Sequence, residues 1–150
     1  MASPPPPPCS AGKGERPPPP SYGSAMTIDI HDARSLLSGD DFTIVTATLA
    51  TTHPELGWVA AEQRVLEALK FVAAMACYPD VGLAPSGPVD AGWHALIDNT
   101  AISARLCVRL GVFVHHYPAV TGTESPAPGW QDRSMTAVKA AGFDASPDLW

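Results

Sequence analysis

The sequence predicts an all-α domain of about five helices that follows a proline-rich arm. Apolar residues recur at three- and four-residue intervals along several segments after residue 26, which is the periodicity of amphipathic helices. Proline and glycine stand at the ends of these segments, where helices stop. A chain of 150 residues is expected to form one domain, and residues 26–150 are enough for a core without disulfides.

Residues 1–25 form a low-complexity arm that contains the proline runs Pro4–Pro8 and Pro17–Pro20. Such runs adopt an extended polyproline helix and bury little surface, so we expect a disordered arm. The alternative is a docking segment for a partner protein with an aromatic groove.

Two helices are expected early in the domain. Thr27 or Asp29 can cap a short first helix that ends near Gly39. The second, Phe42–Thr52, contains many β-branched residues, which favour a strand. Its apolar residues nevertheless follow helical spacing, and the pair Asp40-Asp41 before it is typical of a helix start, so we predict a helix.

Gly57–Tyr78 carries the most regular helical pattern of the chain. One apolar stripe is flanked by charged residues that we expect to face outward: Glu62, Arg64, Glu67 and Lys70. A further helix is predicted from Asp90 to Leu110 and should pack against Gly57–Tyr78. The last helix, Gln131–Ala141, precedes a C-terminal segment whose Trp150 is expected to dock on the domain or to contact a partner.

Asp90 and His94 are the first candidate site residues. They are four positions apart and therefore lie on one face of the predicted helix, with Asp98 one turn further on. After Gly111 the chain can fold back along this helix, because glycine tolerates the positive φ of a reversal. That reversal would bring His115 or His116 to the same place.

We expect Asp90, His94 and one of the two later histidines to converge. His115 is favoured, because His116 precedes Tyr117-Pro118 and is expected to point outward. Trp93 and Phe113 would form apolar walls around the cluster.

Two or three imidazoles with one carboxylate match the ligand sets of zinc, iron(II) and copper. A hydrogen-bonded core cluster without metal is the alternative, because the spacing is none of the established zinc patterns. Cys107 lies within an apolar stripe and is expected to be a core thiol rather than a nucleophile. The glycines form no phosphate-binding pattern.

A family resemblance involves the same residues: Val89-Asp90, Trp93-His94, Thr100, Cys107, Gly111, Phe113 and His115-His116-x-Pro118. This pattern resembles small bacterial proteins of the glycine-rich domain-containing family, which is similar to a domain of unknown function in plant glycine-rich proteins. The resemblance covers about residues 40–118. It implies no particular activity.

Charge and hydropathy narrow the function classes. A formal net charge of −6 and a pI near 5.1 argue against a nucleic-acid surface. No apolar run is long enough to span a membrane, and the start MASPPPPPCS lacks the features of a signal peptide, so we expect a cytoplasmic protein. The sequence thus favours a small metal-binding helical protein, either an enzyme or an accessory factor. A metal-free helical interaction module is the alternative, with the arm or Trp150 contacting a partner.

Overall fold

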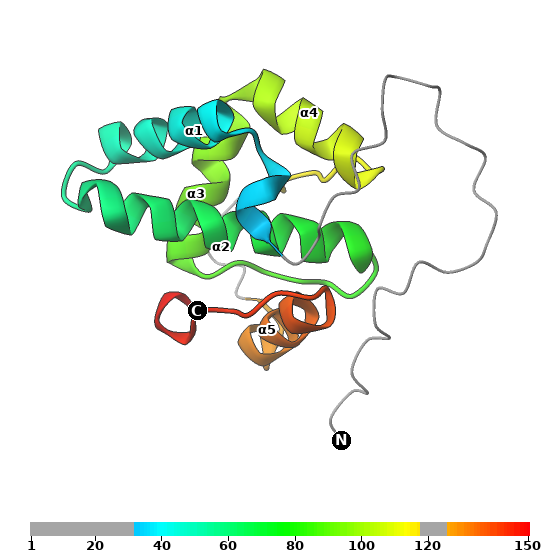
Figure 1. The fold of residues 1–150 in the computed structure, drawn as a ribbon. Helices are drawn as coiled ribbons and strands as arrows, with labels where there is room; N and C mark the ends of the chain where they lie inside the picture. Colours follow the sequence, from blue (N-terminus) through cyan, green and yellow to red (C-terminus); the bar gives the residue numbers. More distant parts are fainter. Residues whose placement is uncertain (1–31, 118–125) are drawn as a thin grey trace.

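The computed structural model describes residues 32–117 and 126–150, which contain α-helices and short 3₁₀ helices and no strand (Figure 1). The all-α prediction is therefore confirmed. The proline-rich arm, Thr27 and Asp29 lie outside the described residues. The elements in chain order are η1 (Ala33–Leu36), α1 (Gly39–Thr52), α2 (Gly57–Cys77), α3 (Gly87–Asp98), α4 (Thr100–Leu110), α5 (Trp130–Ala140) and η2 (Pro147–Leu149).

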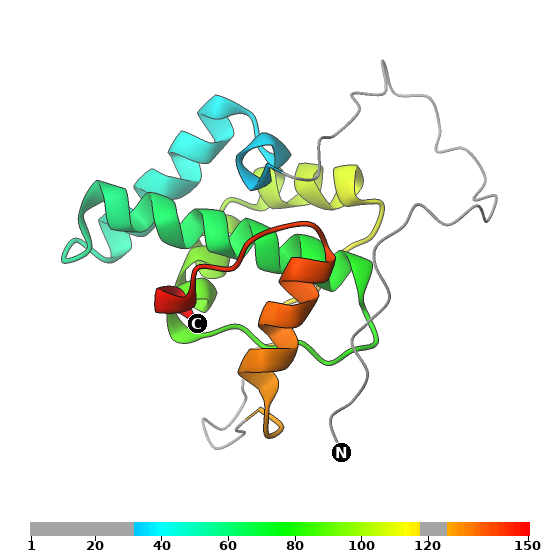
Figure 2. The ribbon, with the colours of Figure 1, turned by 60° about the horizontal axis from the view of Figure 1, so that its bottom comes forward.

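Helix α2 is the central element of the domain. Figures 1 and 2 show it crossing the middle, with α1 and α4 on one side and α5 and the C-terminal segment on the other. It packs against α1, α3 and α5, and its predicted packing against the helix that begins before Asp90 is confirmed. One hydrophobic core extends from η1 to the segment after α5, and its largest fully buried apolar side chains are Phe42, Phe71, Leu36, Leu49, Leu69, Leu96 and Leu106.

The segment with many β-branched residues is helical, as predicted. Ser38 caps α1 by accepting a hydrogen bond from the backbone N–H of Asp41. The hydroxyls of Thr43 and Thr48 each donate to the carbonyl four residues earlier, so these side chains are satisfied within the helix. The buried face of α1 provides enough core contacts to override the strand preference of its β-branched residues.

The single helix predicted from Asp90 to Leu110 is wrong, because Asn99 separates α3 from α4. The Asn99 backbone leaves the helical region, with φ −93° and ψ 72°. Its side-chain amide donates to the carbonyl of Ala95 at 2.8 Å and to the hydroxyl of Thr48 at 2.9 Å. The Asn99 amide thus provides a hydrogen-bond donor to the Ala95 carbonyl at the end of α3, where the helix no longer continues.

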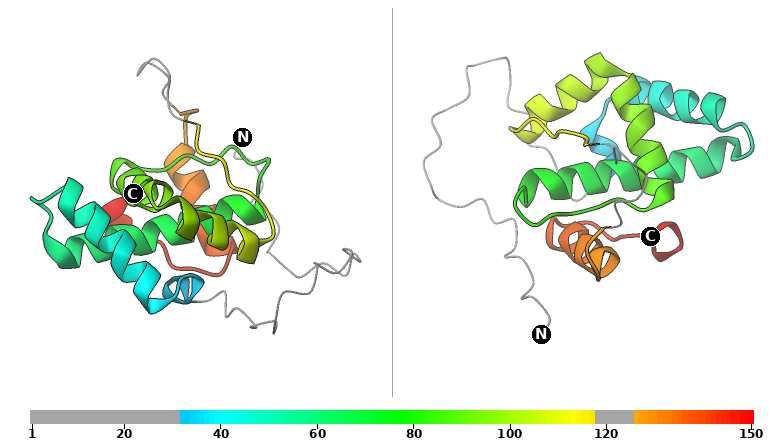
Figure 3. Two further views of the ribbon diagram at one scale, coloured as in Figure 1. Left: turned by 90° about the horizontal axis from the view of Figure 1, so that it is seen from above. Right: turned by 180° about the vertical axis from the view of Figure 1, so that it is seen from behind.

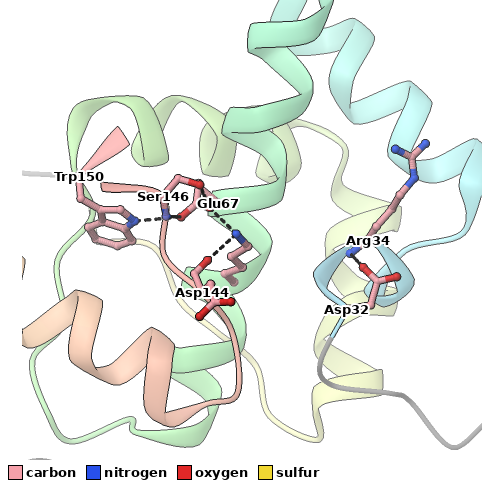
Figure 4. Close-up of polar contacts among 7 residues, drawn as sticks. Asp32, Arg34, Glu67, Asp144, Ser146 and Trp150 are labelled. Carbon is pink, nitrogen blue, oxygen red and sulfur yellow. Dashed lines mark hydrogen bonds and ion pairs between the residues drawn. The ribbon is translucent and has the colours of Figure 1, made fainter. Parts of the chain in front are cut away.

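The expectation that Glu67 faces outward is also wrong. Glu67 is only 1% exposed, and its carboxylate accepts hydrogen bonds from the Ser146 hydroxyl at 2.9 Å and from the Trp150 indole N–H at 3.0 Å (Figure 4). Lys70 donates to the same carboxylate and to the carbonyl of Asp144. The C-terminal segment therefore docks on α2 through a buried carboxylate.

Helices α2 and α3 lie in close contact at Gly92. A β-carbon at this position would lie 2.8 Å from the carbonyl carbon of Arg64 and 3.0 Å from the β-carbon of Ala68. Only glycine permits this separation of the two backbones. The close approach fixes the position of α3, which carries the first two candidate site residues.

Candidate metal centre

Helix α3 presents Asp90 and His94 on one face, as their spacing predicts. Its N-terminus is capped by Ser86, whose hydroxyl accepts from the N–H of Val89, and Pro88 lies in the first turn. Asp90 is thus inside the helix rather than at its cap. His94 Nε2 lies 3.3 Å from Asp90 Oδ2, and both side chains are partly open to solvent.

The segment after α4 turns back towards α3 (Figure 3). Gly111 ends α4 with φ 76°, the left-handed conformation that glycine adopts without strain. Beyond it, the N–H of Val112 bonds the carbonyl of Cys107 at 3.2 Å, and the N–H of Val114 lies 3.5 Å from the Cys107 sulfur. Cys107 is a buried free thiol that anchors this turn, in agreement with the predicted core role.

The turn brings His116 to the face of α3. His116 Nε2 lies 3.0 Å from Asp90 Oδ1, and the rings of His94 and His116 have centroids 4.5 Å apart. Asp90, His94 and His116 each offer one ligand atom, and these atoms all lie within 4.8 Å of one another. Ligands at about 2.1 Å from a tetrahedral ion lie roughly 3.4 Å apart, so this arrangement needs only small shifts to surround one ion.

The preference for His115 over His116 is wrong. Side chains alternate along an extended segment, so the two neighbouring histidines point in opposite directions. The His115 ring lies between Phe113, at a centroid distance of 4.6 Å, and Tyr117, at 5.9 Å. It faces solvent at the edge of the pocket instead of joining the cluster. Asp98, at the end of α3, is exposed and does not join the cluster either.

Trp93 forms an apolar wall beside the cluster, as expected. Its ring and the His116 ring pack edge to face at a centroid distance of 4.5 Å, and it contacts Phe71 at a centroid distance of 5.4 Å. The prediction that Phe113 forms a second wall is wrong, because this side chain is 62% exposed and does not line the pocket. The pocket next to the cluster has a volume of about 550 Å³.

Two contacts that sequence reasoning missed hold the loop in front of α3. The Ser86 hydroxyl donates to the carbonyl of Leu149 in the C-terminal segment. The Ser134 hydroxyl on α5 accepts from the N–H of Ala84 at 3.1 Å and donates to its carbonyl at 2.8 Å. Serines give no pattern that identifies such long-range partners, although a buried serine on an otherwise apolar helix face is a sign of one.

A second histidine–carboxylate pair shows what distinguishes the cluster. His53 Nδ1 lies 3.2 Å from Glu55 Oε1, and both side chains are exposed. A hydrogen bond from its own backbone N–H, with a smaller contribution from His53, holds the pKa of the Glu55 carboxyl below its usual value. No third ligand joins this pair among the described residues. The third residue, His116, is what makes the α3 cluster a candidate for a metal ion.

Comparison with models of protein families, with curated proteins and with solved structures finds no match to this chain. The resemblance to the glycine-rich domain-containing family therefore stays a prediction. Within residues 32–117 and 126–150, no helix is long and apolar enough to cross a membrane.

Proposed function

We propose that the protein binds one divalent transition metal ion through Asp90, His94 and His116. The observation that carries this proposal is the convergence of their three ligand atoms within 4.8 Å. Two of these residues come from one helix and the third from a segment held by a separate turn. Zinc, iron(II) and copper all accept ligands of these types.

Three protein ligands leave at least one coordination position open. Catalytic zinc sites keep such a position for water, and a two-histidine, one-carboxylate set with open positions suits non-haem iron(II). The pocket beside the cluster gives a substrate access to that position. We therefore infer a metal-dependent enzyme, or an accessory factor that holds a metal for one, acting in the cytoplasm.

Metal titration of the full chain, purified without a histidine tag, tests the proposal. Wild type should bind one equivalent of zinc by calorimetry, and His94→Ala and His116→Ala should each weaken binding by tenfold or more, because each removes a direct ligand. His115→Ala and His53→Ala are the matched controls and should retain wild-type affinity. Equal zinc affinity in His116→Ala and His115→Ala would contradict the proposed ligand set.

An interaction module without metal is the second candidate. The exposed apolar side chains of Val108, Phe113 and Tyr117 favour it, because they gather at the end of α4 and along the returning segment. A partner contact through the proline-rich arm stays a prediction. Trp150 favours this candidate less, since its indole N–H is bonded to Glu67 within the domain. If the folded protein binds no stoichiometric metal, the interaction module becomes the favoured function.

The resemblance to the glycine-rich domain-containing family is part of the proposal. Asp90, Trp93 and His94 come from its first motif, and His116 comes from its second. These four residues meet at one place in the fold through the contacts described above. A motif whose separated halves meet in space is consistent with a shared site.

A further inference from the structure

The pocket beside the cluster has a chemical character of its own. We propose that it takes an uncharged ligand with an apolar body and one nitrogen or oxygen that coordinates the metal. This inference rests on the proposed metal site, because Asp90, His94 and His116 form the polar end of the pocket.

The size and lining of the pocket support an apolar ligand body. A volume of about 550 Å³ lies within the range of small-molecule sites. The pocket is lined by apolar and aromatic side chains from four segments of the chain, among them Met75, Leu83, Pro85, Trp93, Tyr117 and Pro126. Polar groups gather where the cluster lies. An apolar wall with a few convergent polar groups is typical of sites that orient an apolar ligand.

The lining of the pocket offers no cationic side chain to an anionic ligand. None of the described residues that line it is lysine or arginine, and Asp90 brings a carboxylate to its edge. Proteins bind carboxylates and phosphates with guanidinium or ammonium groups, which this lining does not supply. The formal net charge of −6 also repels anions that approach the molecule. A bound divalent ion would give the cluster of two neutral imidazoles and one carboxylate a net charge of +1, so an anion could reach the ion but would find no further cation among the described lining residues. An uncharged ligand needs no such cation.

The loop that lines the pocket is held in place before any ligand arrives. Ser134 fixes Ala84 through both of its backbone groups, and Ser86 bonds Leu149. Pro85, between them, removes further backbone freedom. A wall fixed in this way loses little conformational entropy when a ligand binds. Less of the favourable contact free energy is therefore offset by ordering.

Cobalt-loaded full-length protein provides the test, with imidazole, 4-phenylimidazole and inorganic phosphate as probes at pH 8. Each probe is titrated while the visible absorption of Co²⁺ is followed. We expect 4-phenylimidazole to bind about tenfold or more tighter than imidazole, because the pocket buries its phenyl ring. Phosphate should bind more weakly than imidazole.

The outcomes separate this inference from the proposed function. If Co²⁺ gives a protein-bound spectrum but 4-phenylimidazole binds no tighter than imidazole, the inference is overturned and the metal site stands. The same holds if phosphate binds tightest of the three probes. If Co²⁺ gives no protein-bound spectrum, the proposed metal site fails and the inference fails with it.

Two glycine substitutions locate the phenyl ring. Gly87 and Gly39 both begin a helix after a capping serine, and a β-carbon at either position meets no atom within 4 Å. Gly87 lines the pocket, whereas Gly39 begins α1 and is not among the lining residues. Gly87→Leu should remove most of the gain from the phenyl ring and leave the Co²⁺ spectrum unchanged. Gly39→Leu should keep the gain, and an equal loss in both variants would overturn the inference.

Discussion

Glu67 shows how one side chain can connect distant parts of this chain. Its carboxylate is buried and is satisfied by Lys70 on the same helix and by Ser146 and Trp150 from the C-terminal segment. A buried charge is tolerated only when it is paired and hydrogen-bonded in this way. The Trp150 ring also packs against Phe71 at a centroid distance of 5.8 Å, so the polar contact and the apolar contact support each other.

Glu67→Ala should destabilise the domain by about 3–5 kcal/mol, because it leaves the donors of Lys70, Ser146 and Trp150 without their shared acceptor. Urea denaturation followed by circular dichroism measures the loss. Glu62→Gln on the same helix is the control and should change stability by less than about 0.5 kcal/mol. A loss of similar size in both variants would show that the buried contacts of Glu67 contribute little.

The residues of the candidate site were predictable in part from the sequence. The four-residue spacing of Asp90 and His94 fixes their common face wherever the segment is helical, and the structure confirms it. The selection of His116 over His115 depends on how the chain turns after Gly111, and the sequence does not specify that path. Local charge patterning predicts an outward-facing Glu67, because its partners Ser146 and Trp150 lie about eighty residues further along the chain and leave no local signal.

The most extensive packing between the described helices is the contact of α2 with α3. Gly92 permits the close approach, and α3 presents Asp90 and His94 from the position that this contact sets. The helix at Phe42–Thr52 was predictable from capping and spacing. The break at Asn99 was not, because it depends on a contact with Thr48 of another helix. Local patterns thus identify the elements, whereas contacts between elements set their ends.

Gly92→Ala should destabilise the domain by about 1–3 kcal/mol, because the added methyl group collides with the backbone at Arg64. Gly87→Ala on the same helix adds a methyl group where no atom lies within 4 Å, and it should be neutral or slightly stabilising. Thermal denaturation compares the two variants. Equal melting temperatures would mean that α2 and α3 separate at little cost.

The α3 shift in Gly92→Ala should also weaken zinc binding, because it moves Asp90 and His94 relative to His116. Calorimetry on the folded variant measures this loss, which we expect to be severalfold. Unchanged affinity would show that the site adjusts independently of the helix contact.

For the whole molecule, metal binding and stability should be linked. An ion that binds only the folded protein stabilises it by about 2.7 kcal/mol at a free concentration of 100 times Kd. Zinc at that concentration should therefore raise the melting temperature of wild type by roughly 10 °C, given an unfolding entropy of about 2.1 cal/mol/K per residue. Asp90→Ala should show no such increase, and an equal increase in both proteins would indicate binding elsewhere.

Removal of residues 1–25 should leave the melting temperature within a few degrees of wild type. The hydrophobic core described above is built from residues of η1 and later elements, and proline runs bury little surface. Differential scanning calorimetry of the full and shortened chains makes the comparison. A larger decrease would show that the arm packs on the domain.

The partners of Glu67 also determine when the domain can be completed during protein synthesis. Ser146 and Trp150 follow Glu67 by 79 and 83 residues. At translation rates of about 5–20 residues per second, roughly 4–16 seconds pass between the addition of Glu67 and the addition of these partners. Until then, α2 exposes a charged group that its final packing buries. The nascent chain therefore keeps one side of its central helix hydrated, and docking of the C-terminal segment is expected among the last folding events.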